Sequence, residues 1–241
     1  MERRFDRDPA APSDAGGGVA TTDPTRGETA RRAQTNGAGS LGTEAAPMVM
    51  KPITADPGPL GLASFAATTF ILSMFNSGLM GASGEPIVLG MALAVGGLAQ
   101  LFAGMWEFRT GNTFGATAFT SYGAFWLSFW AFEQFYASKI TDQATVQHAV
   151  GLYLITWGIF TAYMTIASLR VSAAVCTVFV LLTATFLLLG IGNAAESTSI
   201  VKAGGFVGLA TALAAWYASF AGVTNATFGR TVLPVRELTR S

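Results

Sequence analysis

The chain has 241 residues, of which 51% are hydrophobic and only 12% are charged, and its formal net charge is zero. A soluble domain carries about twice that charged share, and no basic stripe typical of nucleic-acid-binding proteins is present. The single Cys176 excludes an intrachain disulfide, and the single His148 excludes a multi-histidine metal site. The composition therefore indicates an integral membrane protein, and we expect no cofactor and no metal.

The beginning of the chain differs from the rest. Residues 1–55 contain half of the basic and half of the acidic residues, in a setting rich in Gly, Ala, Thr and Pro. No aromatic residue lies between Phe5 and Phe65. Such a segment buries too little apolar surface to offset the entropy of ordering it. We predict a disordered cytoplasmic tail over residues 1–52, a transporter domain over 53–234 and a short cytoplasmic C-terminal tail over 235–241.

The remainder of the chain contains six apolar windows, each close to the length of about 20 residues that crosses a bilayer as a helix. Their interiors mix Gly, Ala, Ser and Thr with Leu, Val and Phe, as in helices that pack closely in lipid. The predicted fold is therefore an all-α membrane protein with six transmembrane helices. The expected spans are Leu60–Ala82, Pro86–Phe108, Phe114–Tyr136, His148–Leu169, Val171–Gly192 and Gly204–Ala226. The longest connecting loop is expected at about Ala137–Gln147.

The distribution of Lys and Arg predicts the orientation of these spans. With six spans, both tails and the loops after the second and fourth spans share one side of the membrane. That side holds all the basic residues except Lys139 and Lys202. Because cytoplasmic loops are enriched in Lys and Arg, both termini are predicted to be cytoplasmic.

Three of the expected spans carry a face of small and polar residues at helical spacing. Such faces are typical either of helix packing stabilised by hydrogen bonds or of a narrow wet path through the bundle. Three such polar faces in one chain modestly favour a wet path over packing alone. The faces are Phe65, Thr69, Ser73 and Asn76 in the first span, Gly96, Gln100, Gly104 and Glu107 in the second, and Thr117, Ser121, Ala124 and Ser128 in the third.

Glu107 and the linker that follows it are further candidates for the path. Glu107 lies near the predicted cytoplasmic end of the second span, where it either pairs with Arg109 or acts as a protonatable carboxylate. The linker after it contains two glycines together with Asn112 and Thr113. It is either a plain interfacial turn or irregular backbone beside a water-filled cavity.

The sequence contains no catalytic constellation. There is no paired-carboxylate dyad on one helix face, no HExxH motif and no P-loop. We therefore do not expect an enzyme.

Several motifs are similar to those of one family. The segment Asp56-Pro-Gly-Pro-Leu-Gly-Leu62 resembles the opening motif Asn-Pro-Ala-Pro-Leu-Gly-Leu of the acetate uptake transporter family, the YaaH/SatP-like succinate–acetate permeases. In this motif we take Asp56, Pro57, Pro59, Leu60, Gly61 and Leu62 as site residues. Further matches follow in the same order at 96–104, 111–123, 157–161, 191–193 and 228–234. The resemblance covers about residues 53–234.

This resemblance implies a six-helix protomer, cytoplasmic termini and a ring-shaped homo-hexamer with a separate path through each protomer. It also implies a pore constriction made by Phe65, Tyr122 and Leu182, one residue each from the first, third and fifth spans. An apolar ring of this kind obstructs hydrated ions. The substrate path is expected to include Thr69, Asn76, Gln100, Glu107, Asn112, Thr113, Thr117 and Ser121.

Two positions depart from the family motif, because Asp56 replaces its Asn and Gly58 replaces its Ala. Asp56 either adds negative charge beside a path for anions or caps the first span as Asn does. The function predicted is a cell-membrane permease that moves acetate, and other short carboxylates such as succinate, together with protons. The alternatives are a passive anion channel for the same solutes and a non-transporting membrane sensor or scaffold.

Overall fold

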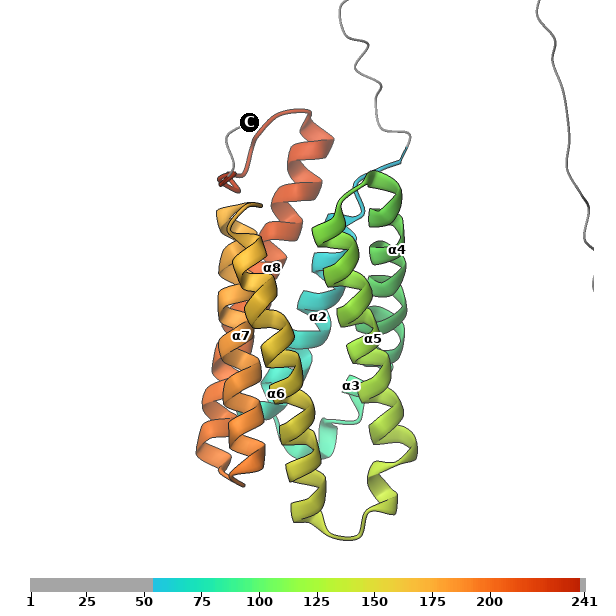
Figure 1. Ribbon diagram of the computed structural model, residues 1–241, viewed down its shortest axis with the longest axis vertical. Helices are drawn as coiled ribbons and strands as arrows, with labels where there is room; N and C mark the ends of the chain where they lie inside the picture. Colours follow the sequence, from blue (N-terminus) through green and yellow to red (C-terminus); the bar gives the residue numbers. More distant parts are fainter. Residues whose placement is uncertain (1–53, 239–241) are drawn as a thin grey trace, which may run out of the picture. The chain divides into compact units, whose positions relative to one another are not determined.

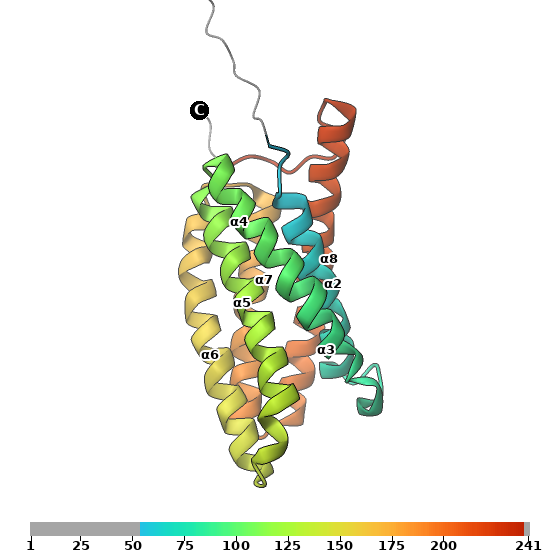
Figure 2. The same cartoon turned by 90° about the vertical axis from the view of Figure 1, so that its right-hand side faces the viewer.

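The computed structural model describes residues 54–238, and the predicted tail over residues 1–52 lies outside them. The described part is a bundle of long helices joined by short connections (Figures 1 and 2). The long helices are α2 (Gly58–Asn76), α4 (Gln100–Thr110), α5 (Thr113–Phe135), α6 (Gln143–Ser168), α7 (Ala173–Ala194) and α8 (Thr198–Phe228). The shorter elements are η1 (Ala82–Gly84), α3 (Ile87–Met91), η2 (Ala92–Ala99) and η3 (Ala137–Lys139).

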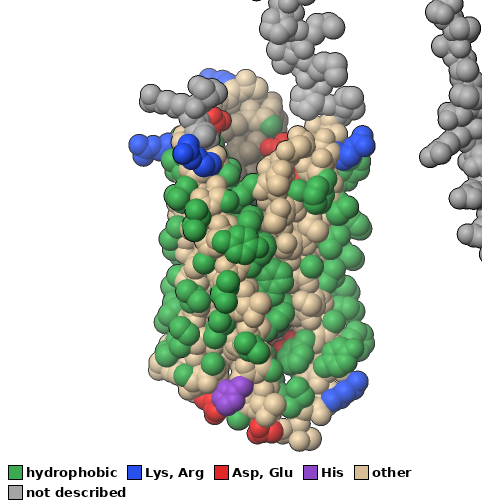
Figure 3. All heavy atoms as spheres, in the orientation of Figure 1, with side chains coloured by type: hydrophobic (Ala, Val, Ile, Leu, Met, Phe, Trp, Pro, Cys, Tyr) green, Lys and Arg blue, Asp and Glu red, His purple; other side chains and the backbone are tan. Residues whose placement is uncertain are grey.

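Five helical segments in the range 54–238 are long and apolar enough to cross a membrane. They are Gly58–Asn76, Ala82–Thr110, Gln143–Ser168, Ala173–Ala194 and Thr198–Phe228. Side chains of hydrophobic residues cover the middle of the molecule, and charged side chains gather at its two ends (Figure 3). The third expected span, Phe114–Tyr136, corresponds to α5 and is not among these five; α5 is long enough but contains many Gly, Ser and Thr residues and Glu133. The chain is therefore a membrane protein with several apolar helices.

The helix ends correct two boundaries expected from the sequence. The first span ends at Asn76 rather than Ala82, because Gly78 adopts a positive φ of 79° that a helix does not allow. The loop expected over Ala137–Gln147 is wrong in its second half, since α6 already begins at Gln143. Asp142 caps this helix by accepting a hydrogen bond from the backbone N–H of Thr145.

The helices pack in two groups, α2 with α4 and α5 and α6 with α7 and α8, which are joined by the contact between α2 and α8. Helix α2 packs along α8, α7 packs against both α6 and α8, and α4 packs against α5. Glycines allow some of these close approaches. A Cβ at Gly104 would overlap the backbone nitrogen of Thr120, and a Cβ at Gly205 would overlap that of Ser77. The small residues read from the sequence therefore act, at these positions, in helix packing.

The second expected span is one long helix with a π-helical segment, η2, in its middle. In η2 each backbone hydrogen bond joins residues five positions apart, instead of four as in an α-helix. Such π-helical segments are often found at functional sites. Gly96 lies against the Trp126 ring and the Thr68 hydroxyl, where a Cβ would come within 2.7 Å of each. The helix continues with Gln100, whose side chain is completely buried.

Candidate functional site

Two cavities lie one above the other inside the bundle. Helices α2, α5 and α7 all begin at the end drawn at the top of Figure 1, and their first turns surround a cavity of about 180 Å³ that we call the mouth cavity. Deeper along the same helices is a smaller space of about 40 Å³, the central cavity. The mouth cavity is lined by Asp56, Gly58, Leu62, Glu107, Asn112, Phe114, Ala118, Val175 and Phe179, among others. The central cavity is lined by Phe65, Thr69, Ser73, Asn76, Trp126, Leu182 and Phe186, among others.

An aromatic layer separates the two cavities. The rings of Phe65 and Tyr122 have centroids 5.9 Å apart, and Tyr122 and Phe179 have centroids 6.1 Å apart. Phe179 lines the mouth cavity, whereas Phe65 and Leu182 line the central one. Phe65, Tyr122 and Leu182 are at most 4% exposed. Of the three residues predicted to form the constriction, Phe65 and Leu182 thus line the central cavity, and Tyr122 packs against Phe65 and Phe179; their role as a constriction stays a prediction.

A hydrogen bond holds the tyrosine of this layer in place. The Tyr122 hydroxyl oxygen lies 2.9 Å from Thr161 Oγ1, which donates to the carbonyl oxygen of Trp157 at 2.7 Å. The Thr161 proton is thus used, and Tyr122 is the donor of the first bond. A buried phenol needs such a partner. Thr161 lies in the motif over residues 157–161, but the sequence alone gives this threonine no role, because only the packing of α6 on α5 brings the two hydroxyls together.

The polar face of α2 points into the central cavity, since Thr69, Ser73 and Asn76 line it. The Thr69 hydroxyl and the Trp126 Nε1 have no hydrogen-bond partner in the described part of the chain. Neither does the side-chain amide of Gln100. Buried polar groups without partners are costly, so they mark positions where water or a ligand is expected.

The polar face predicted on α5 lies elsewhere. Thr117 and Ser121 are half-buried and are not among the residues that line either cavity, and Thr113 is exposed. The face of α5 that lines the cavities is mainly apolar and includes Phe114 and Ala118. The role of the three hydroxyl residues in a path stays a prediction.

The motif around Asp56 forms the start of α2. Asp56 Oδ1 accepts a hydrogen bond from the Gly58 N–H at 2.8 Å, but the N-cap residue of α2 is Pro57, which has no side-chain capping bond, so the capping role considered for Asp56 stays a prediction. Ser219 Oγ on α8 donates to the carbonyl oxygen of Pro59 at 2.7 Å. Gly61 lies against the Phe119 ring, where a Cβ would come within 2.6 Å. In the same motif Pro57 is buried, Leu62 lines the mouth cavity, and Leu60 is exposed on the outside of the bundle.

Glu107 lies at the mouth cavity and is only 1% exposed. Its Oε2 accepts a hydrogen bond from Thr110 Oγ1 at 3.1 Å, whereas its Oε1 has no hydrogen-bond partner. No ion pair with Arg109 occurs in the range 54–238. Asn112, next to it, caps α5 by accepting the Gly115 N–H at 3.0 Å.

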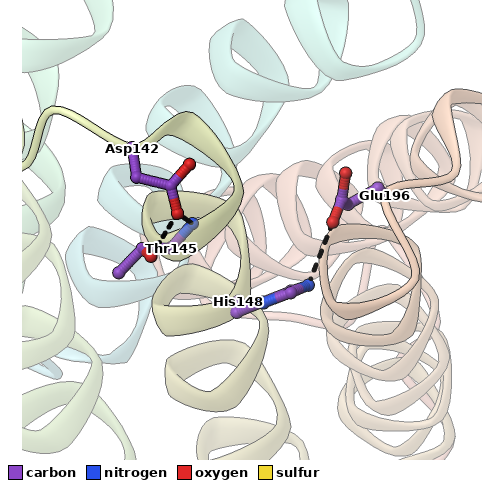
Figure 4. Close-up of polar contacts among 4 residues, drawn as sticks. All are labelled: Asp142, Thr145, His148 and Glu196. Carbon is purple, nitrogen blue, oxygen red and sulfur yellow. Dashed lines mark hydrogen bonds and ion pairs between the residues drawn. The ribbon is translucent and has the colours of Figure 1, made fainter.

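At the opposite end of the bundle His148, Glu196 and Asp142 are exposed. His148 Nε2 lies 3.2 Å from Glu196 Oε1, and both side chains are at least half exposed (Figure 4). The hydrogen bonds that Asp142 accepts from the Thr145 hydroxyl and backbone hold the pKa of this aspartate below its usual value (Figure 4). Glu85 and Glu133 line a third cavity, of about 220 Å³, at this end.

The model of the GPR1/FUN34/yaaH family matches residues 38–240. The chain belongs to this family. As a GPR1/FUN34/yaaH protein it is 43% identical over 183 residues to the succinate-acetate/proton symporter SatP of Escherichia coli, covering 76% of this chain and 96% of that relative. It is 40% identical over 195 residues to acetate permease A of Emericella nidulans, covering 75% of this chain. The resemblance read from the motifs is thereby confirmed.

The fold agrees with this membership. A solved structure described as the bacterial acetate channel SatP superposes with a TM-score of 0.70 at 42% identity, covering 76% of this chain and 99% of that one. The chain spans only 65% of acetate permease A and 62% of accumulation of dyads protein 2 from Saccharomyces cerevisiae. The bundle described here therefore corresponds to the shared part of these longer fungal proteins.

Proposed function

We propose that this protein is a membrane permease that carries acetate, and other short carboxylates such as succinate, together with protons. The observation that carries the proposal is the aromatic layer between two cavities, with no charged residue among those that line the central one. A carboxylate that enters such a space loses its hydration without gaining a counter-charge, which is costly. Protonation removes this cost, so transport with a proton is favoured.

The central cavity offers hydrogen bonds to a small acid that has passed the layer. Thr69 and Trp126 have unpartnered polar atoms there, and the Asn76 amide lies at the same cavity. We propose that these groups bind the carboxyl group while Phe65 and Leu182 contact its methyl end. The names of the relatives, which include an acetate permease and a succinate-acetate/proton symporter, support this class of substrate.

The proposed protomer has six spans, with α5 as the sixth. Helix α5 is 23 residues long, lies between the mouth and central cavities and the outside of the bundle, and is flanked by membrane-length helices. We further propose a ring-shaped homo-hexamer in the cell membrane with both termini cytoplasmic. The excess of basic residues on the side of the termini supports this orientation. In this orientation the mouth cavity faces the cytoplasm.

The test is uptake of labelled acetate into proteoliposomes of the purified full-length protein, with and without an inward proton gradient. We expect saturable uptake that the gradient stimulates and that succinate reduces. Uptake no greater than into empty liposomes, from protein shown to be folded, would contradict the proposal.

A passive channel for the same anions is the second candidate, because the solved relative is described as an acetate channel. It predicts acetate flux that follows the acetate gradient and does not respond to an imposed proton gradient. The same proteoliposomes distinguish the two mechanisms.

A further inference from the structure

The segment that follows α8 turns back across the end of the bundle and meets the start of α7 (Figure 1). Helix α8 ends at Gly229, whose φ of 63° is a conformation that favours glycine and reverses the direction of the chain. Residues 230–238 then run to the first turn of α7, and we call them the C-terminal strap. An antiparallel bridge pairs Ser172 with Glu237. The strap and the start of α7 are thus joined through their backbones, although they are far apart in the chain.

The strap satisfies backbone groups that the start of a helix leaves free. The first amides of an α-helix have no acceptor within the helix itself. In α7 the N–H of Ala173 donates to the carbonyl oxygen of Arg236 at 2.8 Å. The N–H of Ala174 donates to the carbonyl oxygen of Val235 at 3.2 Å. The strap therefore supplies the acceptors for the first two amides of α7.

One side chain on α8 makes most of the contacts that hold the strap. Asn225 Oδ1 accepts hydrogen bonds from the backbone N–H groups of Val232 and Leu233, at 2.7 and 2.9 Å. Its Nδ2 donates to the carbonyl oxygen of Leu233 at 2.8 Å. An asparagine side chain has one acceptor group and one donor group, and both bind the strap here. Tyr217, on the same helix, donates its hydroxyl proton to the carbonyl oxygen of Pro234 at 2.7 Å.

The first turns of α7 lie between the strap and the mouth cavity. One face of these turns contributes Ala173, Ala174 and Thr177 to an outer cavity that the strap also lines. The opposite face contributes Val175 and Phe179 to the mouth cavity. A displacement of the start of α7 therefore moves a wall of the mouth cavity.

Side-chain packing holds this part of α7 only weakly. From Ala173 to Thr177 no residue is fully buried, and the first buried residue of the helix is Val178. A turn of small, half-buried residues removes little apolar surface from water, so packing stabilises it little. The backbone hydrogen bonds to the strap therefore determine a large share of its position.

We propose that Asn225 is a positioning residue for transport, because it fixes the C-terminal strap and thereby holds the start of α7 at the wall of the mouth cavity. This role rests on the proposed function, within which Asn225 determines how well an arriving carboxylate fits the mouth cavity. Asn225 is not among the residues that line the mouth cavity or the central cavity. It acts on the substrate through the strap and α7, and not by contact.

Hydrogen–deuterium exchange of the full-length protein in lipid tests the contact without transport. Asn225→Ala removes the three hydrogen bonds from this side chain to the strap. We expect the amides of residues 171–176 to exchange on the order of tenfold faster than in wild type, because protection follows the free energy of local opening. Residues 143–149 at the start of α6, which Asp142 caps, should exchange as in wild type. Unchanged exchange over residues 171–176 would overturn the proposal.

Asn193→Ala is the matched control, because Asn193 Nδ2 donates to the carbonyl oxygen of Leu189 within α7 itself. Exchange over residues 171–176 should stay at the wild-type rate in this variant, and faster exchange there would contradict the assignment to the strap. Asn225→Asp keeps the acceptor oxygen and should restore most of the protection, whereas exchange as fast as in Asn225→Ala would overturn the role of these bonds.

A milder variant keeps the test decisive if Asn225→Ala does not fold. Tyr217→Phe removes only the bond to Pro234. It should speed the exchange over residues 171–176 by a smaller factor, and a wild-type rate there would then count against the strap. Size-exclusion profiles identical to wild type exclude misfolding as the cause of any change.

The kinetics of acetate uptake into proteoliposomes separate a positioning role from a merely structural one. A displaced wall of the mouth cavity weakens substrate binding there, so we expect Asn225→Ala to raise the KM for acetate about threefold or more. The maximal rate per folded protein should stay within about twofold of wild type, and Asn225→Asp should restore the KM.

The outcomes distinguish this role from the proposed function. A lower maximal rate with an unchanged KM in Asn225→Ala would show a merely structural role and overturn the inference, although the proposed function would stand. If wild type carries no acetate, the proposed function fails, while hydrogen–deuterium exchange still decides whether Asn225 holds the start of α7 through the strap.

Discussion

Acidic side chains are arranged differently at the two ends of the bundle. Where α2 and α5 begin, Glu107 is 1% exposed and lines the mouth cavity together with the exposed Asp56. At the other end His148 and Glu196 form an ion pair whose side chains are 55% and 50% exposed. Water screens charges at the exposed end, whereas burial strengthens electrostatic interactions at the mouth. We therefore expect substitution of the buried Glu107 to have a larger effect than substitution of the exposed Glu196.

The largest expected effect comes from filling the mouth cavity. A Cβ at Gly115 would lie 2.7 Å from Glu107 Oε1, so Gly115→Val should displace that carboxyl group. Overpacking a tight contact costs about 1–3 kcal/mol, and we expect acetate uptake to fall about tenfold or more. Gly81→Val is the matched control at the other end, because a Cβ there meets no atom within 4 Å. Equal losses in both variants would show that the two ends do not differ.

The next effect concerns selection by size at the aromatic layer. Phe65→Ala removes a ring that lies at the boundary of the central cavity and contacts Tyr122. We expect the uptake of benzoate relative to acetate to rise on the order of tenfold, as differences of one or a few carbon atoms in an apolar pocket allow. Leu182→Ala should act in the same direction. An unchanged ratio in both variants, measured by competition, would place these residues outside the path.

The helix caps at the two ends should respond differently to pH. Asn112 caps α5 at the mouth with a neutral amide, and Asn112→Ala should cost about 0.5–2 kcal/mol of unfolding free energy at every pH. Asp142 caps α6 with a carboxylate whose pKa is lowered by its bonds to Thr145. Its contribution is therefore complete above the ordinary aspartate value of 3.8 and is lost as the pH falls through the lowered pKa.

Thermal unfolding of both cap variants over a range of pH measures this contrast. The decrease in unfolding temperature caused by Asp142→Ala should disappear in strong acid, whereas that caused by Asn112→Ala should persist. A pH-independent decrease for Asp142→Ala would mean that its carboxylate charge does not contribute to the cap.

The smallest effect is expected at the exposed ion pair. His148→Gln should lower the stability by less than about 1 kcal/mol, because exposed pairs are screened by water and salt. Uptake of acetate should stay at the wild-type level. A loss of proton stimulation in this variant would show that the exposed end takes part in coupling and would remove the contrast between the ends.

Much of the fold could be predicted from the sequence alone. The positions of the six long helical segments follow from the apolar windows, since a stretch of about 20 apolar residues has few alternatives to a buried or membrane helix. Their ends could be predicted less well, because a cap such as Asp142 is only effective when its side chain reaches a free backbone N–H. The face of α2 that lines the central cavity was also predictable, since Thr69, Ser73 and Asn76 recur at helical spacing.

The site depended more on tertiary structure. Helix α5 turns mainly apolar residues such as Phe114 towards the cavities although it also has a polar face, and only its packing on α4 and η2 decides which face points there. Tyr122 meets Thr161 only through the packing of α6. Asp56 and Glu107 are 51 positions apart in the chain, and no periodicity within one helix relates them. The sequence by itself determined the membrane class, the helices and the family, because these depend on local composition and motifs, whereas contacts between helices decided which side chains line the cavities.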